Sequence, residues 1–129
     1  MSHTTNLVSV MSLPTQSKDQ HLLVATIEEA RLTGECMHEV LWLSMREMIR
    51  ETPSATTLVI SFQHVSHITS LTISTLLRIQ RFATERGIGL SLTDVSDGMR
   101  EVFRILRLDG TVLSIEGTYT EVATNSIAI

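Results

Sequence analysis

Residues 58–77, LVISFQHVSHITSLTISTLL, combine two hydrophobic patterns within one short stretch. The first part, with Thr57, is a continuous run of apolar and β-branched residues that ends at Phe62. Such a run is typical of a strand buried on both faces, as in a parallel sheet covered by helices. From Ile73 onward apolar residues recur every three or four positions, which predicts a helix over residues 70–86. The polar residues between them therefore form a loop that leads from the carboxyl end of a strand into a helix.

The same alternation continues downstream of this helix. Gly87 is placed to end it, and residues 90–95 predict another strand. Residues 97–106 predict a helix capped by Ser96 or Asp97, with Met99, Val102, Phe103 and Leu106 on one face. A turn at Asp109-Gly110, a short strand at 112–115 and a closing helix at 119–126 complete the pattern. Strand–helix–strand crossovers join parallel strands, so this half of the sheet is expected to be parallel.

The N-terminal half predicts two strands and one helix. Residues 7–13 and 22–27 read as strands, joined through Pro14 and a polar loop at 15–20, and we expect them to pair antiparallel. An irregular segment at 28–34 follows, and a helix at 37–51 ends before Pro53. The expected buried stripe of this helix consists of Met37, Val40, Leu41, Met45, Met48 and Ile49.

These elements predict an α/β domain over residues 1–129, with its core at about 7–118. Its architecture is a single mixed, largely parallel β-sheet with helices packed on it and an antiparallel N-terminal strand. The run at 57–62 is expected to be a central strand. We expect five residues to be buried: Ile60, Ile73, Leu77, Val102 and Phe103.

Composition and charge exclude several classes of protein. The 129 residues are 43% hydrophobic and 19% charged, which suits a folded core rather than a disordered chain. The net charge of −4 with interspersed signs does not favour a nucleic-acid partner. Cys36 is the single cysteine, so an internal disulfide is impossible, and we expect it to pack in the interior. Without a signal peptide or a long apolar run, we expect a cytoplasmic protein with no membrane contact.

The loop at 63–69 and the start of the next helix carry the residues that suggest chemistry. His64, His67 and Ser70 are three positions apart, but no nearby cysteine or carboxylate supplies a further metal ligand. No Gly-x-Ser-x-Gly nucleophile elbow and no glycine-rich phosphate loop occur. We therefore expect no enzyme activity, no metal and no cofactor. Thr69 or Ser70 is expected to cap the helix.

The stretch at 58–77 resembles the STAS domain, in which a hydrophobic strand and a short turn lead into an Asp-Ser-Ser/Thr-Gly-Leu-like motif and a helix. Three further stretches fit in order and spacing: ARLTGE at 30–35, Arg86-Gly87 before a strand, and REVFRILRLD at 100–109. The resemblance covers roughly residues 7–118. It implies that the family's phosphorylated serine falls on Ser70.

The motif departs from the family pattern around this serine. Thr69 stands in the Asp position, Leu71 follows the serine, and Thr72 stands in the Gly position. Some family members also carry a serine or threonine instead of the Asp, so Ser70 stays the predicted phosphoacceptor.

The resemblance implies a non-catalytic regulatory binding module of the bacterial anti-sigma-factor antagonist type. Its implied partners are an anti-sigma factor with serine kinase activity and a serine phosphatase, acting in a partner-switching system that regulates transcription. The predicted partner-binding surface is formed by His64, His67, Thr69, Leu71 and Thr72. Two other hypotheses remain open: a constitutive interaction scaffold in which Ser70 is not phosphorylated, and a sensor that binds a small ligand between sheet and helices.

Overall fold

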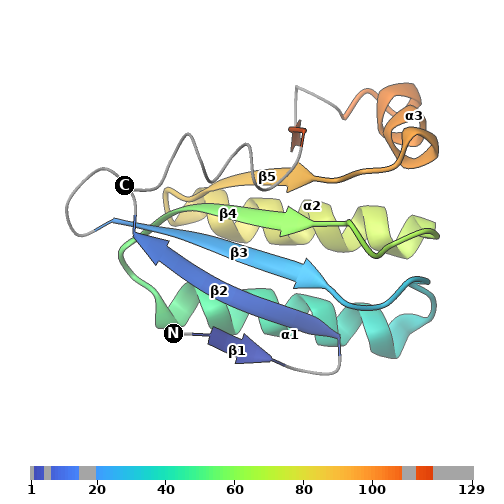
Figure 1. Cartoon of the computed structure of the whole chain (residues 1–129). Coiled ribbons are helices and arrows are strands. Elements are labelled where there is room, and N and C mark those ends of the chain that lie inside the picture. The colour runs from blue at the N-terminus through green and yellow to red at the C-terminus, as the bar shows by residue number, and fades with distance from the viewer. Residues whose placement is uncertain (1, 5–6, 15–19, 109–112, 118–129) are drawn as a thin grey trace.

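A single sheet organises the computed structural model, which describes residues 2–4, 7–14, 20–108 and 113–117 (Figure 1). The strands lie in chain order across the sheet. They are β1 (Ser2–Thr4), β2 (Val8–Pro14), β3 (His21–Ile27), β4 (Ala55–Ser61), β5 (Gly89–Thr93) and β6 (Ser114–Ile115). The pairs β1–β2 and β2–β3 are antiparallel, and the other three pairs are parallel. The predicted mixed sheet with an antiparallel N-terminal part is confirmed.

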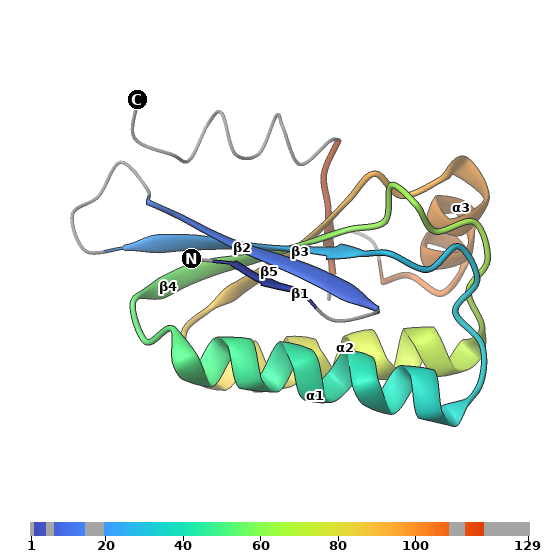
Figure 2. The same cartoon turned by 60° about the horizontal axis from the view of Figure 1, so that its bottom comes forward.

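Three helices accompany the sheet. The helices α1 (Glu35–Glu51) and α2 (Ser70–Glu85) lie side by side on one face of it, as Figure 2 shows. The shorter α3 (Asp97–Ile105) lies beyond the carboxyl end of β5 (Figure 1). All three predicted helices are confirmed. The predicted turn at 109–110 and closing helix at 119–126, with most of the loop at 15–20, lie outside the described residues.

The core lies between the sheet and the two long helices. Strand β4 pairs with β3 on one side and β5 on the other, and Leu58, Val59 and Ile60 are fully buried, so its central position is confirmed. Phe103 is also fully buried, as predicted. Ile73 and Leu77 are half-buried and pack against this core rather than inside it.

The buried stripe of α1 differs from the predicted one. It consists of His38, Leu41, Trp42, Met45, Met48 and Ile49, whereas Val40 is 43% exposed. Positions 38, 41, 42 and 45 follow helical spacing as well as 37, 40, 41 and 45 do. Four residues of the predicted stripe are buried as expected, His38 and Trp42 join them, and Met37 is partly buried against the core. Cys36 is exposed, contrary to its predicted packing role, because it precedes this stripe.

Two of the four residues predicted to share one face of α3 are exposed. Met99 and Phe103 are buried, but Val102 is 41% exposed and Leu106 is 51% exposed. The helix has nine residues and lies past the end of β5 rather than across the sheet, so only one line of side chains reaches the core.

The helix ends follow their local sequence signals. The Ser96 hydroxyl accepts a hydrogen bond from the Met99 amide at 3.3 Å, which confirms it as the cap of α3. Gly87 follows α2 with a φ of 73°, a left-handed conformation that glycine adopts without steric cost.

Candidate functional site

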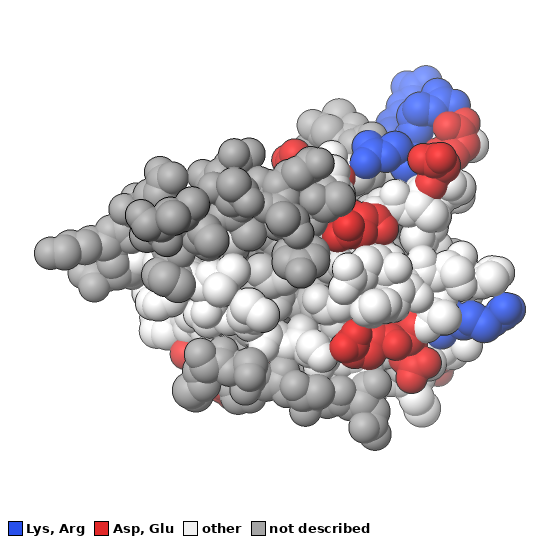
Figure 3. Space-filling view, in the orientation of Figure 1, with Lys and Arg blue, Asp and Glu red and all other residues white. Residues whose placement is uncertain are grey.

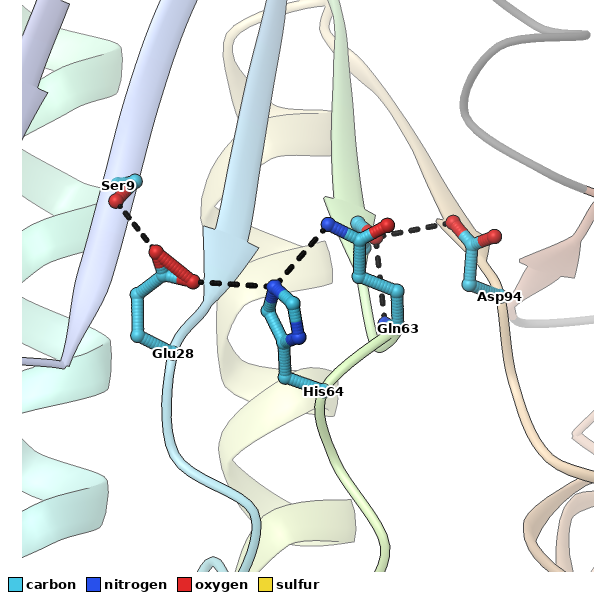
Figure 4. A network of polar contacts seen from close by, with 6 residues as sticks. Ser9, Glu28, Gln63, His64 and Asp94 are labelled. Atoms are coloured by element: carbon cyan, nitrogen blue, oxygen red, sulfur yellow. Dashed lines mark hydrogen bonds and ion pairs between the residues drawn. The ribbon is translucent and has the colours of Figure 1, made fainter.

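Polar side chains from three loops meet at the carboxyl ends of the parallel strands (Figure 4). Glu28 follows β3, and Gln63 and His64 follow β4. The Glu28 carboxylate accepts a hydrogen bond from the Ser9 hydroxyl at 2.9 Å and lies 3.4 Å from His64 Nε2. Gln63 Nε2 lies 3.2 Å from the same ring nitrogen. Ser9 contacts a carboxylate and not the imidazole, so Ser9 and His64 do not form a nucleophile–base pair. These contacts instead connect β2 to the loops after β3 and β4.

A second contact joins β4 to β5 at the same edge. The Ser61 hydroxyl is buried and donates to the Asp94 carboxylate at 2.9 Å. The backbone amide of Gln63 donates to Ser61 Oγ at 3.4 Å. Asp94 has a φ of 57°, a left-handed conformation that aspartate tolerates better than most residues. Its amide donates to the Gly117 carbonyl at 2.8 Å. The loop after β4 is thereby fixed on its β5 side.

The backbone of the β4–α2 loop is also anchored to the segment before α1. The Leu32 amide donates to the His67 carbonyl at 2.9 Å, and the Ser66 and His67 amides donate to the Ala30 carbonyl at 2.7 and 3.1 Å. The side chains of His64 and His67 remain exposed, with His67 Nδ1 placed 2.9 Å from Ser66 Oγ. The loop therefore presents its side chains from a backbone that is bonded on both sides.

Reciprocal capping bonds form the start of α2. Thr69 Oγ1 accepts from the Leu71 amide at 3.2 Å, and Thr72 Oγ1 accepts from the Thr69 amide at 3.2 Å. The Thr72 amide also donates to the Thr69 carbonyl at 3.0 Å. Thr69 is thus the cap, one of the two predicted candidates, and the turn that carries Ser70 is closed by three hydrogen bonds.

A buried histidine connects this turn to the start of α1. His38 Nδ1 lies 2.7 Å from the Gly34 carbonyl oxygen, and His38 Nε2 lies 2.6 Å from Thr72 Oγ1. A carbonyl oxygen only accepts, so in the neutral ring Nδ1 carries the proton and Nε2 accepts from the Thr72 hydroxyl. His38 is 4% exposed and Thr72 is fully buried. The Thr72 hydroxyl is therefore both donor and acceptor, and it joins the two helix starts.

The predicted site residues at the start of α2 differ in exposure. Ser70 is the exposed first residue of α2, and its hydroxyl makes no hydrogen bond to another described residue. Leu71 is 39% exposed, and Thr69 is half-buried. Thr72 does not reach the surface, contrary to the prediction, because its hydroxyl is bonded inside the capping turn.

Sequence reasoning missed His38 and Asp94. The signal for His38 was its spacing, because it lies three and four positions before Leu41 and Trp42 on the buried stripe of α1. The signal for Asp94 was its place directly after β5, at the edge where ligands and partners commonly meet parallel sheets.

A surface groove of about 480 Å³ lies between the first turn of α1 and the first half of α2. Glu39 and Arg78 form an ion pair at its border, 3.6 Å apart, and Arg78 stacks on the Trp42 ring at 4.1 Å. The groove is lined by Glu35, Cys36, His38, Glu39, Leu71, Ser74, Thr75 and Arg78. It lies between two helices at the surface, whereas another pocket of about 290 Å³ lies between sheet and helix, lined by Val8 and Val10 of β2 and by Leu43, Ser44, Glu47, Met48 and Glu51 of α1.

The residues that the structure describes contain no group of three histidine, cysteine, aspartate or glutamate side chains placed to hold a metal ion. None of their helices combines the length and the apolar character needed to cross a membrane.

Comparison with solved structures shows a shared fold. SpoIIAA, an anti-sigma factor antagonist, in its unphosphorylated form superposes with a TM-score of 0.65 at 16% identity, covering 87% of this chain and 94% of that one. An anti-sigma-factor antagonist (STAS) domain protein from Planctomyces limnophilus gives a TM-score of 0.66 at 19% identity, with coverages of 87% and 94%. The phosphorylated form of SpoIIAA, a Bacillus cell fate determinant, gives 0.56 at 19% identity, with coverages of 87% and 97%.

The family assignment comes from the sequence. No curated protein matches the chain at a significant level. A family model described as "Mlab, STAS domain" matches residues 29–115, well over half of the chain, including the whole segment from α1 through the Ser70 turn to β6. The chain therefore belongs to the STAS domain family.

Proposed function

We propose that this STAS domain is a regulatory binding module whose partner docks on the β4–α2 loop and the first turn of α2, and that phosphorylation of Ser70 weakens this docking. The observation that carries the proposal is the position of Ser70. It is an exposed hydroxyl without an intramolecular bond among the described residues, on a turn whose backbone is held by Thr69, Thr72 and His38.

The capping turn should tolerate a phosphate on Ser70. The positive end of the α2 dipole favours a negative group at this position. The Leu71 and Thr72 amides already donate to Thr69. A phosphate is therefore stabilised mainly by the helix dipole, and it has no need to displace the cap.

A partner would respond to the added charge directly. Phosphorylation places about two negative charges on a formerly neutral hydroxyl at the docking surface. Desolvation of these charges and repulsion by any carboxylate of the partner reduce affinity. The switch then operates without a conformational change in this chain.

The proposed partners follow from the family. SpoIIAA is an anti-sigma factor antagonist whose structure is known in unphosphorylated and phosphorylated forms, and both share the fold of this chain. By analogy, we assign this chain an anti-sigma factor with serine kinase activity as its binding partner and kinase. A serine phosphatase would reverse the modification. The chain itself is then a substrate and a ligand, and performs no catalysis.

The test combines mass spectrometry with a charge substitution. Protein isolated from the native host should carry phosphate within residues 66–74, on Ser70. Ser70→Asp should weaken binding to the host's kinase-like anti-sigma factor by at least about tenfold, which corresponds to about 1.4 kcal/mol. Ser70→Ala should retain the parent affinity.

A matched control places a carboxylate elsewhere on the same helix. Thr84→Glu adds one negative charge at the exposed far end of α2 and should leave affinity unchanged. If Ser70→Asp binds as tightly as the parent and no phosphate is found on residues 66–74, the chain is a constitutive scaffold instead.

A further inference from the structure

The buried pair His38 and Thr72 joins two helices that are far apart in the sequence. His38 Nε2 and Thr72 Oγ1 are 2.6 Å apart, although 34 positions separate the two residues. Figure 2 shows α1 and α2 side by side, with both helices beginning at the same end of the sheet. The bond therefore links the start of α1 to the turn that carries Ser70.

This bond has a fixed direction. The Gly34 carbonyl accepts from the His38 backbone amide at 3.4 Å and lies 2.7 Å from His38 Nδ1. In the neutral ring Nδ1 therefore carries the proton, and Nε2 accepts from the Thr72 hydroxyl. Because that hydroxyl has only one proton, its oxygen is left to accept, and it receives the Thr69 amide at 3.2 Å. The ring thus determines the direction of each hydrogen bond between Gly34 and Thr69.

Thr75, close behind Thr72 in α2, satisfies its hydroxyl in a different way. The buried Thr75 hydroxyl donates to the Leu71 carbonyl at 2.7 Å, four positions back in the same helix. Thr72 lies in the first turn, and residue 68 precedes the helix, so His38 supplies the acceptor from α1 instead. Without this acceptor the Thr72 hydroxyl would be buried with its proton unpaired and could turn away from the Thr69 amide.

The last donor in this chain of hydrogen bonds belongs to the residue directly before Ser70. Thr69 is also the helix cap, since its hydroxyl accepts from the Leu71 amide at 3.2 Å. A shift of the Thr69 backbone therefore changes the cap and the direction of the Ser70 hydroxyl together. The charged side chains visible where the parallel strands finish are of both signs (Figure 3). Local hydrogen bonding, rather than a field of one sign, is therefore the means of orienting this turn.

We propose that His38 is a positioning residue for the phosphorylation of Ser70. It acts through Thr72 and the Thr69 amide rather than through contact with the reacting hydroxyl. This inference rests on the proposed function, because it concerns the same hydroxyl and the same kinase.

The reaction shows why the direction of the hydroxyl matters. The Ser70 oxygen bonds to the γ-phosphorus of the nucleoside triphosphate held by the kinase, the bond from this phosphorus to the β–γ bridging oxygen breaks, and the nucleoside diphosphate leaves. The hydroxyl proton passes to a base of the kinase. The attacking and leaving oxygens must be in line, so a hydroxyl held in one direction reacts faster than one on a loosened turn.

Two substitutions at position 38 separate hydrogen bonding from packing. His38→Phe keeps a buried ring but loses the donor and the acceptor, whereas His38→Gln loses the ring but keeps one N–H donor and one acceptor oxygen. With the kinase-like anti-sigma factor of the native host, His38→Phe should lower kcat/KM for Ser70 phosphorylation by at least about tenfold. His38→Gln should stay within about threefold of the parent. Equal losses for both variants, or no loss for His38→Phe, would overturn the inference.

A double-mutant cycle tests whether His38 acts through Thr72. Thr72→Val removes the hydroxyl and should lower kcat/KM about as much as His38→Phe does. If both residues belong to one chain of bonds, the double variant should be at most about twofold slower than the slower single variant. Losses that multiply would mean two independent effects and would overturn the route through Thr72.

Met45→Ala is the matched control for stability. Met45 is a fully buried residue of α1, so its truncation leaves a cavity in the core. This variant should lower the midpoint of urea denaturation at least as much as His38→Phe does, and it should keep kcat/KM within about twofold of the parent. If Met45→Ala slows phosphorylation as much as His38→Phe, lost stability accounts for the effect and the positioning role is wrong.

Amide hydrogen exchange follows the turn without the kinase. The Thr69 amide should exchange at least about tenfold faster in His38→Phe than in the parent, and at close to the parent rate in His38→Gln. An unchanged Thr69 amide in His38→Phe would contradict the chain of bonds on which the inference depends.

The outcomes distinguish this inference from the proposed function. If the parent is phosphorylated on Ser70 at a rate that His38→Phe and Thr72→Val leave unchanged, the switch stands and the positioning role is wrong. If the kinase leaves Ser70 of the parent unmodified, the proposed function is wrong and the positioning role is wrong with it, whatever the exchange rate at Thr69.

Discussion

The first turn of α2 and the outer face of α3 lie at the same end of the sheet, but their chemistry is opposite. The α2 turn is polar, and its groups are paired through Thr69, Thr72 and His38. The α3 face is aliphatic and exposed at Val102 and Ile105. A turn with its hydrogen bonds satisfied can accept a new charge without unfolding, whereas an exposed apolar face lowers its free energy only when a partner covers it. Of the two regions, the α2 turn is therefore the one suited to the proposed phosphorylation switch.

The largest expected effect distinguishes the two sides of α3. Phe103→Ala should destabilise the protein by roughly 3–5 kcal/mol, because it removes a fully buried aromatic ring from the core. Val102→Ala, one position away on the exposed face, should change the free energy of unfolding by less than about 0.5 kcal/mol. Urea denaturation of both variants provides the measurement. Similar losses for the two variants would mean that the exposed face is part of the core.

The next effect concerns the buried bond between the helix starts. His38→Ala leaves the Gly34 carbonyl and the Thr72 hydroxyl without their shared partner, which should cost about 1–3 kcal/mol beyond the loss of packing. His64→Ala removes an exposed imidazole and should cost less than about 0.5 kcal/mol. Equal stabilities of the two variants in urea denaturation would contradict the role of His38.

A smaller effect is expected at the helix cap itself. Thr69→Ala should destabilise the protein by about 1 kcal/mol, because the Leu71 amide loses its acceptor. Amide hydrogen exchange should become faster at Leu71 and stay unchanged in the middle of α2. Thr69→Ser keeps the hydroxyl and serves as the control. If Thr69→Ser is as destabilising as Thr69→Ala, packing of the methyl group and not capping accounts for the loss.

Local patterns in the sequence predicted most of the fold, and long-range geometry accounts for the errors. The run at 57–62 and the three- and four-residue spacing after Ile73 identified β4 and α2, and Thr69 was recognised as a candidate cap from its place before that helix. Each of these signals lies within a few residues of the element it describes.

The errors came from the placement of one element against another. Val40 and Val102 fit helical stripes as well as the buried residues do, but the way α1 and α3 lie against the sheet leaves both side chains exposed. His38 and Thr72 are 34 positions apart, so their bond depends on how two helices are aligned. For the site, the sequence placed Ser70 by family resemblance, whereas the burial of Thr72 required the structure.

The Ser70→Asp variant tests most directly whether switching is confined to the charge on the α2 turn. Its free energy of unfolding and its affinity for the kinase-like anti-sigma factor should be measured together. We expect stability within about 0.5 kcal/mol of the parent, since the helix dipole favours a carboxylate at this position, and a loss of affinity of at least about tenfold. A variant that loses stability and affinity together would place the effect on the fold, and one that keeps the parent affinity would contradict the switch.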